Sequence, residues 1–257
     1  MSKMPVLFVG HGSPMNAVEE NRYTNTWKEI AAGIPRPACI LCVSAHWYTR
    51  GTRIMSQENP KTIHDMYGFP DELYQIFYPA PGSPATALAA KSLITREAAL
   101  DDTWGIDHGA WSVLVHMYPG RDIPVFQLSV DALAPPETHY QIGRELAPLR
   151  KEGVLILGSG NVVHNLRMVD WHMEGQGFDW AHQFDDFIRQ SVLTGKHDGV
   201  VNYQAKGDTA RLAVPTPDHF YPLLYPLGAA EEGETVRVFN SHCEMGSLSM
   251  TGYLWGN

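Results

Sequence analysis

Several histidines in this sequence stand where side chains can take part in chemistry. His11 and His46 each follow a run of apolar, β-prone residues, so we expect each one just past the carboxyl end of a buried strand. In open α/β sheets, ligands bind at that edge. Imidazole is a common metal ligand and also exchanges protons near neutral pH. Two imidazoles delivered to one sheet edge therefore predict a metal site.

Further histidines extend this set. His108 stands between an acidic residue and a glycine, a setting that favours an exposed catalytic imidazole in a loop. His164 follows a predicted strand through a Gly-Ser-Gly turn, by a route similar to that of His11 and His46. His219 comes after two prolines, which stiffen its approach. The candidate ligands His11, His46 and His219 are far apart in the sequence, so only the fold can bring them together.

Other patterns exclude some classes of protein. The sequence has no His-Glu-x-x-His and no paired Cys-x-x-Cys, which excludes that type of zinc protease and a zinc finger. The glycines at 158 and 160 do not make a dinucleotide fingerprint, because Val163 occupies the place of the third glycine. His116 lies in an apolar stretch typical of the core, whereas His139 and His242 are reserve candidates for a metal ligand.

Composition bounds the class of protein. The chain has 257 residues, of which 44% are hydrophobic and 18% charged, as in soluble proteins with a well-filled core. Its net charge of −9 argues against a nucleic-acid surface, and no apolar run approaches the roughly 20 residues that span a membrane. Cys39 and Cys42 lie inside a predicted strand, which favours inert buried thiols. We expect a cytoplasmic protein without a signal peptide.

Short apolar runs alternate with amphipathic segments along the chain. The predicted strands cover residues 5–9, 39–43, 123–130, 153–158 and 235–239. The predicted helices cover residues 17–32, 85–93, 136–150 and 179–194. This alternation favours one α/β domain over residues 1–257, with a central, largely parallel or mixed sheet flanked by helices.

One segment, residues 60–84, lacks periodicity. It holds several prolines and aromatic residues together with His64. Loops of this length inside a compact domain are usually functional or disordered, and the aromatic residues argue against disorder. We therefore expect this segment to fold over the site as a wall or lid.

Taken together, the motifs resemble a known family. They lie at residues 10–15, 44–47, 107–109, 158–165, 215–219 and 244–250. In this order they resemble the class III extradiol ring-cleavage dioxygenases of the LigB superfamily, and within it the 4,5-DOPA dioxygenase branch. The resemblance runs nearly end to end. It implies one metal ion in a pocket at the sheet edge, with a catechol and O₂ as the small-molecule substrates.

The resemblance also implies roles for the histidines. His11, His46 and His219 correspond to metal ligands, and His108 and His164 to an acid/base pair, with His164 near enough to touch the metal as well. Other members of the superfamily supply a carboxylate as the third ligand, as is typical of non-haem Fe(II) oxygenases. With the neutral His219 in place of a carboxylate, the site is more positive and binds Zn(II) more readily. Fe(II) for dioxygenase activity and Zn(II) as the bound form therefore both stay open.

Two other functions fit the same ligands. Three histidines and a water also make a zinc hydrolase site, for which Asp107, Asp218 or Glu244 could serve as the base. A non-catalytic metal-binding protein like the Memo proteins is the second alternative, against which the presence of both His108 and His164 argues. The physiological catechol and the choice between monomer and dimer stay open.

Overall fold

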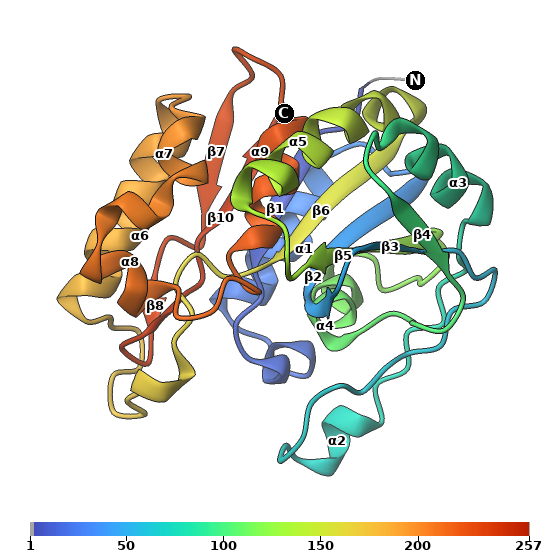
Figure 1. The fold of residues 1–257 in the computed structure, drawn as a ribbon. Coiled ribbons are helices and arrows are strands. Elements are labelled where there is room, and N and C mark those ends of the chain that lie inside the picture. The colour runs from blue at the N-terminus through green and yellow to red at the C-terminus, as the bar shows by residue number, and fades with distance from the viewer. Residues whose placement is uncertain (1–2, 257) are drawn as a thin grey trace.

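The computed structural model describes residues 3–256, which build one α/β domain around a mixed sheet of eight strands (Figure 1). The order of the strands is β4-β3-β5-β2-β6-β1-β10-β7. Their bounds are β1 Val6–Gly10, β2 Cys39–Thr49, β3 Thr52–Met55, β4 Ala98–Asp101, β5 Val125–Asp131, β6 Val154–Gly160, β7 Val236–Phe239 and β10 Gly252–Trp255. Strands β8 (Cys243–Glu244) and β9 (Leu248–Ser249) form a separate pair. Residues 1, 2 and 257 of the predicted domain lie outside the described residues.

The centre of the sheet is parallel, antiparallel pairs join the outer strands to it, and the edge strand β4 pairs in parallel with β3. β2 pairs in parallel with β5 and β6, and β1 pairs in parallel with β6. β1, β5 and β6 are buried along their whole length, as strands covered on both faces must be. β10 runs antiparallel to both β1 and β7, and β3 antiparallel to β5. The predicted α/β class with a mixed sheet is confirmed.

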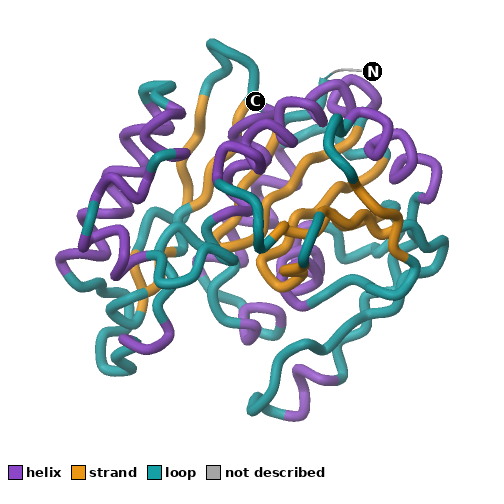
Figure 2. Tube along the Cα trace, viewed as in Figure 1, coloured by secondary structure: helices purple, strands orange, loops and turns teal. Residues whose placement is uncertain are grey.

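Helices cover both faces of this sheet. They are α1 Arg22–Gly33, α2 Asp71–Tyr74, α3 Pro84–Leu93, α4 His108–Met117, α5 Pro136–Leu146, α6 Asp179–Leu193, α7 His197–Val201, α8 Asp208–Ala213 and α9 Leu224–Ala229. α5 and α9 pack together in front of the sheet in Figure 1, and α1 and α4 pack together behind it. Loops gather below the carboxyl ends of the central strands (Figure 2). Among residues 3–256, no helix has the length and apolar character needed to cross a membrane.

The predicted strands and helices are all present, with ends shifted by up to six residues, but other elements were missed. β3 and β4 are four-residue strands, too short to stand out in the sequence. α4 is buried at every position except Val115, so it lacks the polar face that makes a helix recognisable. Sequence periodicity therefore predicted the amphipathic helices and failed for the helix that carries His108.

The three cysteines are free and buried, as the sequence predicted for Cys39 and Cys42. Burial raises the pKa of the Cys39 thiol to about 11 and that of Cys243 to about 12. Thiols held this far from ionisation are poor nucleophiles and poor metal ligands. The chemistry of this protein must therefore be sought among other residues.

Candidate metal centre

His11 follows β1 directly and is held by the neighbouring strand β6. Its backbone N–H donates to the carbonyl of Gly160 at 3.0 Å, and its Nδ1 lies 3.0 Å from Ser159 Oγ. The Ser159 hydroxyl donates its single hydrogen to the carbonyl of Gly109 at 2.6 Å. Ser159 Oγ must therefore accept the Nδ1–H of His11. The lone pair of this imidazole is then on Nε2.

His46 does not lie past the end of its strand, as was predicted, because β2 continues to Thr49. The pairing of β2 with β5 shifts register between Val43 and Tyr48, and His46 lies inside that irregularity. Such bulges turn a side chain out of the regular alternation of a strand. Nδ1 of His46 lies 3.5 Å from Asp65 Oδ2. The bulge thus directs His46 into the centre without ending the strand.

His219 lies between α8 and α9 in the chain. It reaches the centre from the face of the sheet that α9 covers, opposite to the face covered by α4. Its carbonyl accepts a hydrogen bond from Asn161 N at 2.8 Å. A Cβ atom at Gly160 would lie 2.1 Å from that carbonyl oxygen, so only glycine at the end of β6 permits this approach. The ring Nδ1 of His219 is hydrogen-bonded to the carboxylate of Asp218. Its Nε2 is therefore also left with a lone pair.

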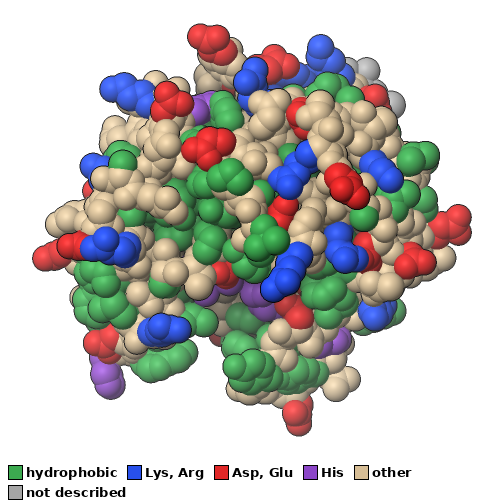
Figure 3. Space-filling model, viewed as in Figure 1, with side chains coloured by type: hydrophobic (Ala, Val, Ile, Leu, Met, Phe, Trp, Pro, Cys, Tyr) green, Lys and Arg blue, Asp and Glu red, His purple; other side chains and the backbone are tan. Residues whose placement is uncertain are grey.

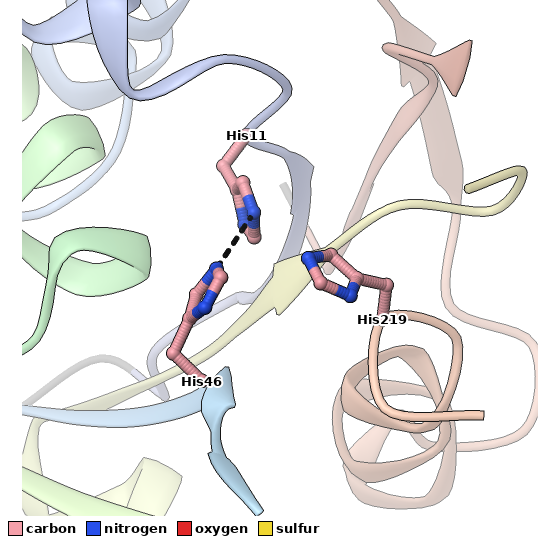
Figure 4. A group of neighbouring side chains, drawn as sticks. All are labelled: His11, His46 and His219. Carbon is pink, nitrogen blue, oxygen red and sulfur yellow. Dashed lines mark hydrogen bonds between the residues drawn. The ribbon is translucent and has the colours of Figure 1, made fainter. Parts of the chain in front are cut away.

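The three imidazoles converge on one point (Figure 4). Their potential ligand atoms lie within 4.8 Å of one another, and the Nε2 atoms of His11 and His46 are 3.3 Å apart. Burial, followed by the neighbouring imidazoles, lowers the pKa of His11 and His219 well below the ordinary value and that of His46 to about 3. Neutral rings whose lone pairs face one another repel, and a divalent cation between them removes that repulsion. The residues present therefore fit a metal ion.

His108 is not the exposed loop residue that the sequence predicted. It is buried, and it is the first residue of α4. The preceding Asp107 caps that helix, because its Oδ1 accepts hydrogen bonds from Ala110 N at 3.1 Å and Ser44 Oγ at 2.7 Å. Its Oδ2 accepts another from Gln127 Nε2 at 2.7 Å. Asp107 is thus a structural residue and makes no hydrogen bond with the His108 ring.

The partner of His108 is Asp65, which sequence reasoning did not single out. Asp65 Oδ1 accepts from the backbone N–H of His108 and Oδ2 lies near its Nδ1, both at 2.9 Å. Burial alone would raise the pKa of Asp65, but its hydrogen bonds with His108 lower it. The His108 ring lies 3.7 Å from that of His46, between centroids. The sequence feature that could have indicated Asp65 was the presence of an acidic residue within the segment predicted to form the wall, residues 60–84.

His164 stacks on the ring of His219, with centroids 3.5 Å apart and planes 5° from parallel. Together with Asp218 and His219, His164 forms another group of potential metal ligands among the residues described. This group shares His219 with the first group but does not include His11. Burial lowers the pKa of His164 to about 4, although the charge of Asp218 opposes the shift. The fold therefore brings all five predicted histidines into one cluster, with His164 on the side of His219.

The remaining histidine predictions can also be compared with the structure. His116 is buried and bonded to the carbonyl of Asn16 at 2.6 Å, as expected of a core histidine. The reserve candidates His139 and His242 belong to no group of potential metal ligands among residues 3–256. His139 is instead bonded to the hydroxyl of Tyr225 at 2.8 Å.

The segment predicted as a wall or lid, residues 60–84, borders the site at Asp65. Ile63 N donates to the carbonyl of Ile106, and Trp111 Nε1 donates to the carbonyl of Ile63, both at 2.8 Å. The tip of the segment, with α2, projects away from the sheet (Figure 1). Figure 3 shows histidine side chains in a hollow beside this lobe. Tyr67, exposed to 90%, and Phe77, to 59%, give the lobe an exposed apolar surface.

Comparison with known proteins agrees with this geometry. Residues 4–252 match the family model of the catalytic LigB subunit of aromatic ring-opening dioxygenase. The chain is 47% identical to a 4,5-DOPA dioxygenase extradiol of Escherichia coli K12, over 97% of this chain and 93% of that protein. It is 37% identical to one of Beta vulgaris, over 96% and 94%. A crystal structure of an uncharacterized Escherichia coli K12 protein, 43% identical, matches with a TM-score of 0.85 over 98% of this chain and 99% of that one.

Proposed function

The chain belongs to the LigB family of aromatic ring-opening dioxygenases, and from this membership we propose that it cleaves a DOPA-like catechol at the 4,5-extradiol bond. It is an extradiol ring-cleavage dioxygenase, with a small-molecule substrate and O₂ as its reactants. The observation that carries the substrate proposal is the name shared by relatives that are 47% and 37% identical over nearly the full chain.

Enzymes of this family depend on a metal ion, and His11, His46 and His219 are the residues we propose to hold it. His164 is a further candidate ligand through its place against His219. Fe(II) is the ion we propose for activity, with Zn(II) as an alternative bound form. When bound, a redox-active ion supplies positive charge that stabilises a catecholate and a route for electrons between ring and O₂. Zn(II) supplies only the charge, since it has no redox chemistry.

His108 and His164 are the proposed acid and base. Both rings lie beside ligand candidates, His108 against His46 and His164 against His219. One of the pair takes a proton from a catechol hydroxyl, and the other donates a proton to oxygen as the ring opens. Both atoms of O₂ enter the product, and the proton removed at the start is returned, so no external reductant is needed. Positioned histidines typically contribute about 10²–10⁴-fold to such proton transfers.

Anaerobic reconstitution with Fe(II) tests this function. After addition of L-DOPA and O₂, we expect oxygen uptake equal to substrate consumed and the appearance of a yellow ring-opened product. His164→Ala should retain the metal to a greater extent than it retains turnover. Zn(II)-loaded protein is the matched control and should take up no oxygen. Inactivity with Fe(II), together with ester or amide hydrolysis by the zinc form, would establish the hydrolase alternative instead.

We also propose that the enzyme works in the cytoplasm. The three cysteines are free and buried, which fits a reducing compartment. The measurement is fractionation of cells that express the full chain. Recovery in a membrane or secreted fraction would contradict the proposal.

A further inference from the structure

A cavity of about 910 Å³ lies next to the histidine cluster. Gly12 and Ser13, which directly follow His11 in the chain, line part of it. Leu248 also lines it and is paired with His164 in an isolated β-bridge. Ligand sites in proteins commonly have volumes of roughly 300–1,000 Å³. The cavity is therefore large enough for part of a substrate, and its lining residues adjoin two of the five histidines.

The lining of this cavity combines charged and apolar side chains. Arg22 is the only lysine or arginine among the described residues that line it. Glu19 and Glu174 are exposed acids of the same lining. Apolar surface comes from Met15, Leu248 and Met250. A ligand with an apolar body, a carboxylate and an ammonium group meets a matching partner for each of its parts.

Arg22 is held in place but still has hydrogen-bond donors to offer. Its Nη2 donates to the hydroxyl of Tyr23 at 2.6 Å and to Glu244 Oε1 at 3.0 Å. The other carboxylate oxygen of Glu244 accepts from Gly175 N at 2.6 Å. Among residues 3–256, no hydrogen bond engages Nη1 or Nε of Arg22, and 51% of its side chain is exposed. The guanidinium is thus oriented by its neighbours and retains N–H groups that can donate to a carboxylate.

Hydrogen bonds also hold the segment that brings Trp171 and Glu174 to the cavity. Asp170 N donates to the carbonyl of Met245, and Met245 N donates to that of Met173, both at 3.0 Å. Trp171 lines the cavity and is nonetheless 77% exposed. The face of an indole ring attracts cations such as an alkylammonium. This segment therefore presents an acid and an aromatic ring, two groups that recognise an ammonium.

We propose that this cavity is the subsite for the side chain of the catechol and that Arg22 binds the carboxylate of that side chain; this inference rests on the proposed function. The substrate class is then a catechol that carries an amino acid group. With the ring at the histidine cluster, the aliphatic part of the side chain lies against the apolar lining. Its ammonium faces Glu19 and Glu174. The enzyme therefore discriminates among catechols by the charges of their side chains.

Arg22→Gln tests the carboxylate contact with catechols that differ only in the side chain. We expect KM to rise about 10-fold for L-DOPA and for 3,4-dihydroxyphenylpropionate, which both carry a carboxylate, with little change in kcat. KM for dopamine and for 4-methylcatechol, which lack a carboxylate, should stay the same. Arg36→Gln is the matched control, because Arg36 also belongs to an exposed ion pair, with Asp122. A similar rise in KM for all of these catechols, or for none, would overturn the proposal.

The two acids should give a different pattern of selectivity. The double variant Glu19→Gln, Glu174→Gln should raise KM for L-DOPA and dopamine, because both carry an ammonium. KM for 3,4-dihydroxyphenylpropionate should not rise. Both side chains are exposed, and surface changes of this kind seldom disturb a fold, so this variant is informative even if Arg22→Gln does not fold. An unchanged KM for dopamine would contradict the proposed subsite.

Binding at the subsite can also be measured without turnover. Zinc-loaded protein is titrated anaerobically with 3,4-dihydroxyphenylpropionate and with 4-methylcatechol in a calorimeter. Arg22→Gln should weaken binding of the first about 10-fold and leave that of the second unchanged. Equal effects on the two ligands would refute the role of Arg22. If the iron-loaded enzyme opens no catechol ring, the proposed function fails, while this titration still decides whether Arg22 binds a carboxylate.

Discussion

At the scale of single residues, each candidate ligand has an oxygen atom of the protein beside its Nδ1. These oxygens belong to Ser159, Asp65 and Asp218. Such partners orient a metal-ligating imidazole and increase its basicity. The family resemblance implied a third ligand without charge, and the structure places two carboxylates directly behind the ligands. Negative charge that is missing among the ligands is thus supplied by the carboxylates that lie next to them.

Asp218→Asn should therefore weaken metal binding. The change removes the charge behind His219 while it preserves the size of the side chain, and we expect the dissociation constant to rise about 10- to 100-fold. Anaerobic titration of metal-free protein with Fe(II) or Zn(II) measures it. Asp102→Asn, at an exposed acid, is the control. Equal affinities for the two variants would show that Asp218 does not support the ligand.

At the scale of elements, the site depends on how closely segments from the two faces of the sheet approach. Ser159 directs its side chain to the carbonyl of Gly109 at the start of α4. Its neighbour Gly160 faces the segment of His219 on the other side. Because successive residues of a strand face opposite sides of the sheet, Ser159 and Gly160 of β6 contact the segments on its two faces. The end of this strand is the point where ligands from both faces can meet.

Gly160→Ala tests that dependence. The new Cβ would overlap the carbonyl of His219, and crowding of this kind typically costs about 1–3 kcal/mol. We expect the free energy of unfolding in urea to fall by that amount and the metal content to decrease with it. Gly33→Ala is a matched control, because a Cβ there meets nothing within 4 Å. A stable, fully metal-loaded Gly160→Ala protein would contradict the account.

At the scale of the whole molecule, a buried arginine joins parts of the chain that are far apart in sequence. Arg150 donates to the carbonyls of Met4 and Ala229, each at 2.8 Å, and to both carboxylate oxygens of Glu234. These contacts tie the approach to β1 to the end of α9 and the start of β7. Burial alone would raise the pKa of Glu234, but hydrogen bonds from Arg150 and Lys3 lower it to about 2.

Glu234→Gln should destabilise the fold by about 3 kcal/mol at neutral pH, because it leaves the buried Arg150 without a counter-charge. Because folding lowers the pKa of the Glu234 carboxyl, this group stabilises the fold at pH values above its unfolded pKa of 4.5. That stabilisation is lost as the pH falls toward 2. The free energy of unfolding should therefore fall less steeply across this window in the variant. Glu232→Gln, at an exposed neighbour, should behave like the unsubstituted protein. Parallel pH profiles for all three proteins would rule out this role.

Much of the frame could be predicted from local patterns. The buried strands of the parallel centre read as continuous apolar runs, and α5 and α6 carry clear amphipathic spacing. α4 could not be predicted in this way, because burial on all sides removes the contrast between faces. The bulge at His46 was also hidden, since it depends on pairing with β5 and not on the residues of β2 alone.

The sequence by itself indicated the kind of chemistry, because five histidines stand in motifs that resemble those of a family of metal-dependent dioxygenases. Tertiary structure alone decided what surrounds each ring. Asp107 is next to His108 in the chain but caps a helix, whereas Asp65, 43 residues away, holds its Nδ1. Hydrogen bonds select a tautomer by distance and direction in space, and these are set by how strands, wall and helix pack, not by proximity along the chain.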